Sequence, residues 1–128
     1  MGYQFTKKLQ SDFDSAITKV TAALKKEGFV VLKSFDLKEA LKSKMNVDFR
    51  KYKILGACNP HFEHQALLEE NNVGTMLPCD VIVQEQKPGS VIISAVDSVA
   101  SNMTFQNEKL GKIAKEVRRK LKNVISNL

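Results

Sequence analysis

The stretch DVIVQEQKPGSVIISAV, at residues 80–96, decides the fold. Two β-rich segments, 80–86 and 91–96, flank Lys87-Pro88-Gly89-Ser90, where Pro88 presets φ and Gly89 accepts a positive φ, as in a type II turn. A connection this short makes a hairpin, and the two strands of a hairpin are antiparallel. An all-parallel, doubly wound sheet is therefore excluded.

Strands and helices alternate before the hairpin, and a helix follows it. A first helix is predicted over 12–27, with Ser11 as its N-cap and Gly28 ending it. Further strands are predicted over 3–9, 29–32 and 52–58, short helices after Asp36 and from Pro60, and a long amphipathic helix from Leu110 to Leu128. The order β-α-β-α-β-α-β-β-α predicts an α+β two-layer sandwich, in which helices pack on a mainly antiparallel sheet of about five strands.

The size and composition are those of one ordinary domain, which we assign to residues 1–128. Apolar residues make up 43% and charged residues 27% of the chain, so a packed core is expected. The start of the chain does not resemble a signal peptide, and no apolar run approaches the ~20 residues that span a bilayer. We expect a cytoplasmic protein with no membrane partner, whose two cysteines, 21 positions apart, are free thiols.

The net charge of +6 is concentrated near the C-terminus. Residues 1–107 carry 13 basic and 12 acidic side chains, whereas residues 108–128 carry 7 basic and 2 acidic ones. Such a basic helix could contact phosphates, but it lacks aromatic residues that would stack on bases. A solvated helix face explains it more simply, and we expect no nucleic-acid partner.

Two short motifs carry a family resemblance. Lys53-Ile54-Leu55-Gly56-Ala57-Cys58-Asn59-Pro60 and Leu77-Pro78-Cys79-Asp80 resemble the signatures of domain-of-unknown-function family 302, and segments 35–49 and 110–117 support the match. The resemblance covers essentially the whole chain. It implies a small bacterial α+β domain of unassigned activity that forms a homodimer. The chain departs from the family's pattern at three positions. Asp80 stands where the family usually has Asn, Glu63 stands where it has a small residue, and Ser98 stands where it has a proline.

The two motifs are also the preferred candidate site. Asn59 is a good N-cap and Pro60 suits a first helical position, so the free N–H groups of that helix start could bind an anion. His61 and His64 would add positive charge there, whereas the carboxylate of Glu63 would oppose the binding of an anion. The preferred hypothesis is a non-catalytic domain that binds a small molecule or an anion through Cys58, Asn59, Pro60, Leu77, Pro78, Cys79 and Asp80.

Other functions remain open on the sequence alone. Cys58 and Cys79 could serve a thiol enzyme or a redox sensor, or they could simply pack in the core. No cofactor is expected, although Cys58, His61, His64 and Cys79 offer a Cys₂His₂ set as a zinc alternative. No catalytic motif is present, which favours binding over catalysis, and a structural homodimer module is the third hypothesis.

Overall fold

The computed structural model describes residues 4–72, 79–97 and 108–128. The strands are β1 (Gln4–Gln10), β2 (Val30–Asp36), β3 (Tyr52–Cys58), β4 (Cys79–Lys87) and β5 (Ser90–Val96). The helices are α1 (Phe13–Lys26), α2 (Leu37–Met45), α3 (Pro60–Glu69) and α4 (Glu108–Ser126). This is the predicted order of elements in an α+β fold, so the fold class is confirmed.

The strands form one fully antiparallel sheet in the order β1-β5-β4-β3-β2. The predicted hairpin is present as β4 and β5, and Gly89 takes the positive φ of 84° that its turn requires. β2 is longer than predicted because it continues to Asp36, and a bulge between Val31 and Lys33 interrupts its pairing with β3. Strands β1 and β2 are the two edges of the sheet.

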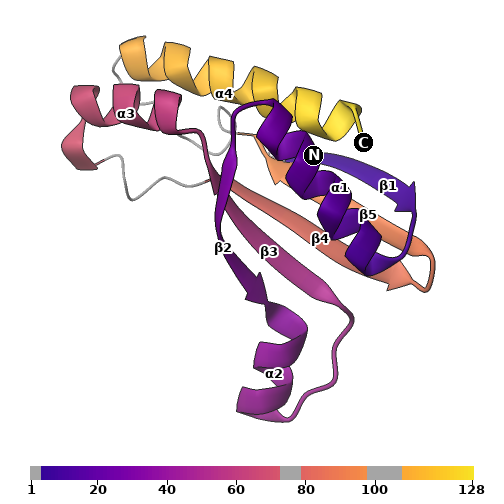
Figure 1. Cartoon of the computed structure of the whole chain (residues 1–128). Helices are drawn as coiled ribbons and strands as arrows, with labels where there is room; N and C mark the ends of the chain where they lie inside the picture. Colours follow the sequence, from indigo (N-terminus) through magenta and orange to yellow (C-terminus); the bar gives the residue numbers. More distant parts are fainter. Residues whose placement is uncertain (1–3, 73–78, 98–107) are drawn as a thin grey trace.

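Two helices cover one face of this sheet. α1 buries Phe13, Ala16, Val20 and Leu24, and α4 buries a stripe that includes Val117, Leu121 and Val124. These side chains meet one face of the central strands, including Leu55, Val81, Val83 and Ile93, in the main core. Figure 1 shows α1 and α4 across this face, α3 beside the first part of α4, and α2 apart from the other helices at the opposite end.

The first helix begins differently from the prediction. Asp12, not Ser11, is the N-cap, and its carboxylate accepts hydrogen bonds from the backbone N–H and the hydroxyl of Ser15. These bonds, rather than burial, hold the pKa of Asp12 below its usual value. Both residues are good N-caps, and the backbone of Ser11 is instead bonded to Gly89 in the hairpin turn.

Candidate functional site

The antiparallel pairing of β3 with β4 brings the two motifs together. Ala57 lies opposite Cys79 and Gly56 lies opposite Asp80, so the end of β3 adjoins the start of β4. Leu77 and Pro78, which complete the second motif, lie outside the described residues, as does Ser98. The described part of the candidate site is therefore built from the β3–α3 junction and the first two residues of β4.

The two cysteines point to opposite faces of the sheet. Residues that lie opposite each other on neighbouring strands point to the same face of the sheet, so Cys79 lies with Ala57 on the helix-covered side. Cys58 follows Ala57 in β3, and successive residues of a strand alternate, so Cys58 points to the other face. Cys79 accordingly belongs to the main core cluster, and Cys58 does not. Both thiols are buried and free.

Burial raises the pKa of both thiols and makes them harder to ionise. It raises the pKa of Cys58 from 9.0 to about 11, helped by a hydrogen bond to Glu63 and by that carboxylate's charge. It raises the pKa of Cys79 to about 12, and the charges of Asp80, Cys58 and Glu63 add to the effect. A nucleophilic or redox-active cysteine needs the opposite shift, so these values disfavour the thiol-enzyme hypothesis.

We therefore expect both thiols of the folded protein to resist iodoacetamide at pH 8. A thiol with a pKa of about 11 is about one part in a thousand thiolate at that pH, roughly a hundredfold less than a thiol with the ordinary value. Mass spectrometry after timed alkylation measures this, with urea-unfolded protein as the reactive control. Fast labelling of either cysteine in the folded state would restore the thiol hypothesis.

The raised pKa values of the two thiols predict how the free energy of unfolding depends on pH. Because the folded state holds these protons more tightly than the unfolded chain, the thiols contribute their full stabilisation below pH 9. That contribution is lost as the pH rises through 11 to 12.

Asn59 occupies the N-cap position of α3 and Pro60 begins the helix, as predicted, but the side chain of Asn59 has a different role. Its side chain makes no cap hydrogen bond at the start of α3, so the predicted N-cap contact is absent. Instead, its amide Nδ2 donates to the backbone oxygen of Glu27, at 3.2 Å. Gly28, next to Glu27, has a φ of 85°, and a Cβ placed there would come within 3.2 Å of the same Nδ2. Asn59 therefore joins the end of α1 to the β3–α3 junction.

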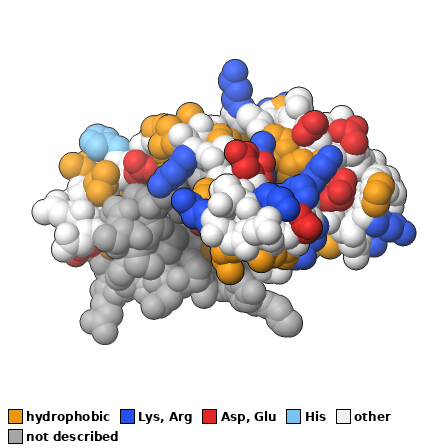
Figure 2. All heavy atoms as spheres, turned by 90° about the horizontal axis from the view of Figure 1, so that it is seen from below, with side chains coloured by type: hydrophobic (Ala, Val, Ile, Leu, Met, Phe, Trp, Pro, Cys, Tyr) orange, Lys and Arg blue, Asp and Glu red, His pale blue; other side chains and the backbone are white. Residues whose placement is uncertain are grey.

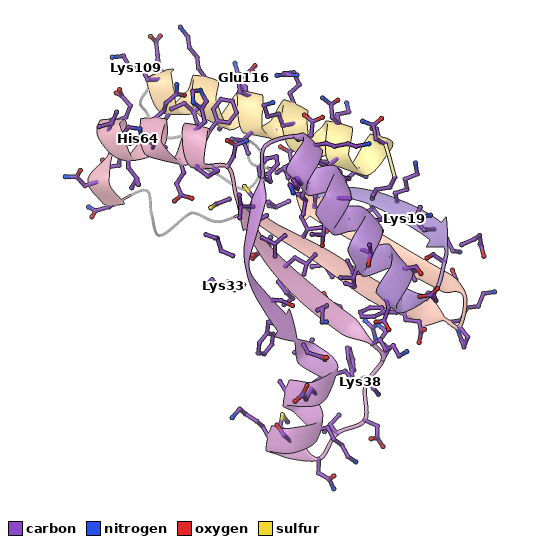
Figure 3. The ribbon with its side chains drawn as sticks, in the orientation of Figure 1. Lys19, Lys33, Lys38, His64, Lys109 and Glu116 are labelled. Carbon is purple, nitrogen blue, oxygen red and sulfur yellow. The ribbon has the colours of Figure 1, made fainter. Side chains whose placement is uncertain are left out.

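The two histidines are exposed on α3. His61 contacts the Phe62 ring edge-on and lies 3.4 Å from the amide nitrogen of Gln65, and Figure 3 shows His64 on the same helix. Cys79 faces the core while both histidines are exposed, so the four side chains of the Cys₂His₂ alternative do not point to a common centre that could hold a zinc ion. Among the described residues, no three metal-ligating side chains form a group that could hold an ion.

Two further residues, Glu63 and Lys33, belong beside the predicted ones. Glu63, which the sequence marked as a departure from the family pattern and as a charge that opposes an anion, lies close enough to Cys58 to help raise the pKa of its thiol. Lys33 on β2 and Asp80 on β4 both lie opposite Gly56 on β3. The lysine and the carboxylate therefore stand in one row across the sheet, with the glycine between them. Neither relation could be seen before the strand order and register were known.

Two surface cavities formed by described residues lie elsewhere. One, of about 360 Å³, lies between the C-terminal halves of α1 and α4 and is lined by Lys19, Lys26 and Leu128 among others. The other, of about 470 Å³, lies beside α2, where Lys42 forms an exposed ion pair with Asp48. Neither includes a residue of the two motifs.

The basic face of α4 is partly neutralised within the protein. Arg118 pairs with the buried Asp97 at 3.1 Å, and Arg119 pairs with Glu116 at 3.0 Å. Lys109 and Lys120 lie 3.8 Å from Glu69 and Glu27. These contacts give four of the seven basic side chains a partner within the chain, and the face keeps its simpler interpretation as a solvated surface.

The fold and the paired motifs define a class: a two-layer α+β domain with a cysteine at each of two adjoining strand ends. The model of the family described as "Domain of unknown function DUF302" matches residues 5–128, and the chain belongs to that family. A solved relative is the uncharacterized conserved protein DUF302 from Bacillus stearothermophilus, 28% identical over 98% of each chain, with a TM-score of 0.87. No curated protein matches.

No described helix is both long and apolar enough to cross a membrane.

Proposed function

We propose that this protein is a non-catalytic binding domain for a small molecule, with its site where the β3–α3 junction meets the start of β4. The proposal rests on one observation, the register that sets Ala57 opposite Cys79 and Gly56 opposite Asp80. Two sequence motifs that are far apart in the chain thereby adjoin. Cys58, Asn59, Glu63 and Asp80 are the described side chains offered to a ligand there.

The protonation of the thiols supports binding rather than catalysis. With pKa values of about 11 and 12, Cys58 and Cys79 carry their protons at neutral pH and are poor nucleophiles. A neutral thiol can still donate a weak hydrogen bond or pack against an apolar group. Both properties suit a site that holds a molecule without changing it.

The local charge favours a neutral or cationic ligand over an anion. Carboxylates at Glu63 and Asp80 contribute to the raised thiol pKa values, which means that they create a negative potential around the cysteines. Lys33, across Gly56 from Asp80, offsets one of these two carboxylates, and the negative charge that remains opposes the binding of a phosphate or a carboxylate at the start of α3. The anion-binding form of the hypothesis is therefore the weaker one.

An NMR titration of the ¹⁵N-labelled protein tests this proposal with three probes at constant ionic strength: butylammonium, butanol and inorganic phosphate. We expect the strongest binding for butylammonium and the weakest for phosphate. Asp80→Asn should weaken butylammonium binding about tenfold, because a hydrogen bond to a charged group contributes about 1.5–3 kcal/mol. Glu85→Gln, on the same strand beyond the site, is the matched control.

Two results would overturn the proposal. Phosphate binding more tightly than butylammonium would contradict the charge argument. If none of the three probes moved any amide signal, that result would contradict the existence of a small-molecule site.

A further inference from the structure

The cavity between α1 and α4 has an apolar floor. Its volume of about 360 Å³ is within the range of small-molecule pockets, roughly 300–1,000 Å³. Two consecutive alanines of α1, Ala22 and Ala23, line it together with Val124 and Leu128 from the end of the chain. An alanine side chain is a single methyl group, so these two positions leave the hollow between the helices open.

Two lysines of α1 lie on either side of these alanines. Lys19 and Lys26 are about two helical turns apart, so both lie on the same face of α1, separated by about 10 Å along its axis. Both line the cavity, and Figure 3 shows Lys19 on α1 close to the C-terminal end of α4. The aliphatic stem of a lysine can cover apolar surface while its ammonium group stays in water. The apolar floor therefore has a positive charge at each end.

The charges of these two lysines are not neutralised within the protein. Among the described residues, neither Lys19 nor Lys26 has a hydrogen-bond or ion-pair partner. Glu27, the acidic side chain that lines this cavity, lies 3.8 Å from Lys120 of α4, so its charge already has a partner. The amide of Asn127, which also lines the cavity, can donate a hydrogen bond to an anion. The cavity thus offers two positive charges and a neutral donor.

The carbonyl groups at the ends of the two helices also have partners. Helix C-termini carry a partial negative charge, which would oppose an anion nearby. At the end of α4, Lys7 Nζ donates to the backbone oxygens of Ser126 and Leu128, at 3.3 and 2.7 Å. At the end of α1, the backbone oxygen of Lys25 accepts from the N–H of Gly28 at 3.0 Å. These contacts weaken the negative potential at this end of the two helices.

The lysines of the cavity beside α2 are already engaged, in contrast. Lys42 pairs with Asp48 at 3.2 Å, and Lys38 donates to the backbone oxygen of Phe49 at 2.7 Å. Figure 2, which views the molecule from the side of α2, likewise shows Lys and Arg side chains intermingled with Asp and Glu. Charge complementarity to an anion therefore distinguishes the cavity between α1 and α4 from the one beside α2.

We propose that the cavity between α1 and α4 binds a linear dicarboxylate with an apolar chain. One carboxylate accepts hydrogen bonds from the ammonium group of Lys19 and the other from that of Lys26, while the chain lies over Ala22 and Ala23. Hydrogen bonds between two ionised groups are stronger than those between neutral groups. A ligand with a single carboxylate would leave one ammonium group unmatched, so two acid groups suit this cavity better than one.

Isothermal titration calorimetry of the full chain tests this proposal with three linear probes at constant ionic strength. Suberate carries a carboxylate at both ends, octanoate carries one, and octanediol carries none. We expect the dissociation constant to rise about tenfold from suberate to octanoate and again to octanediol, because each step removes a hydrogen bond between charged groups. Undetectable binding of suberate, or octanoate that binds as tightly, would overturn the proposal.

Three charge variants test the assignment of the lysines. Lys19→Gln and Lys26→Gln should each weaken suberate binding about tenfold, because each removes one of the two charged contacts. Lys25→Gln is the matched control, since Lys25 is an exposed lysine of the same helix that does not line the cavity. An equal loss in all three variants would show only a general effect of positive charge and would contradict the site.

A further variant tests the cavity with both lysines in place. Ala22→Leu should fill the hollow and abolish suberate binding, and because Ala22 is exposed the fold should tolerate the change. Thr21→Leu, at an exposed position outside the cavity, is the matched control and should bind suberate like the unaltered protein. Circular dichroism checks that both variants are folded. A folded Ala22→Leu variant that still binds suberate would place the ligand elsewhere and overturn the proposal.

Discussion

Replacing Leu121 by alanine is expected to lower the free energy of unfolding by about 2–5 kcal/mol. Leu121 is completely buried, and it lies in the middle of the α4 stripe that packs on the sheet. Truncating it removes apolar contacts and leaves a cavity that the two layers cannot close without moving. Because domains of this size are typically stable by about 5–15 kcal/mol, the loss is a large share of the total.

Urea denaturation followed by circular dichroism measures this change. Lys122→Ala, one residue further along the same helix, is the control for helix propensity and should alter the free energy of unfolding by less than about 0.5 kcal/mol, because Lys122 is exposed. Equal effects of the two substitutions would mean that α4 does not pack on the sheet through this face.

Replacing Gly28 by alanine should destabilise the protein through two separate causes. The φ of 85° costs a residue with a Cβ about 1–2 kcal/mol. The added Cβ would also lie 3.2 Å from the Nδ2 of Asn59 and strain its hydrogen bond to Glu27, which is worth about 1 kcal/mol. We expect a total loss of about 2–3 kcal/mol.

Gly89 is a matched control for the first cause. Its φ is 84°, and a Cβ placed there would meet nothing within 4 Å. Gly89→Ala should therefore cost only the backbone strain, and thermal or urea denaturation of both variants isolates the Asn59 contact by difference. If the two substitutions cost the same, Asn59 does not hold α1 against the β3–α3 junction.

Local sequence signals predicted much of the fold. Pro88 and Gly89 predicted the hairpin because the turn depends on φ values that these two residues set themselves. The apolar stripe of α4 predicted a helix packed on one face because helical periodicity is visible along the chain. Such features depend on neighbours within a few positions, so a single sequence contains them.

The details that shape the candidate site depend on partners far away in the chain. The amide of Asn59 bonds to Glu27, 32 positions earlier, which no capping rule could indicate. The opposite orientations of Cys58 and Cys79 follow from the register of β3 against β4. The contact of Glu63 with Cys58 follows from where α3 turns after Pro60. The sequence predicted that the two motifs adjoin, but not how their side chains face.

The central claim is that the β3–α3 junction and the start of β4 form a single site. The location of the amide signals that move in the butylammonium titration tests it most directly. The account predicts that amides of Cys58, Asn59 and Glu63 shift together with those of Cys79 and Asp80, at one common dissociation constant. Shifts confined to one of these two segments, or to the cavities beside α2 and between α1 and α4, would contradict it.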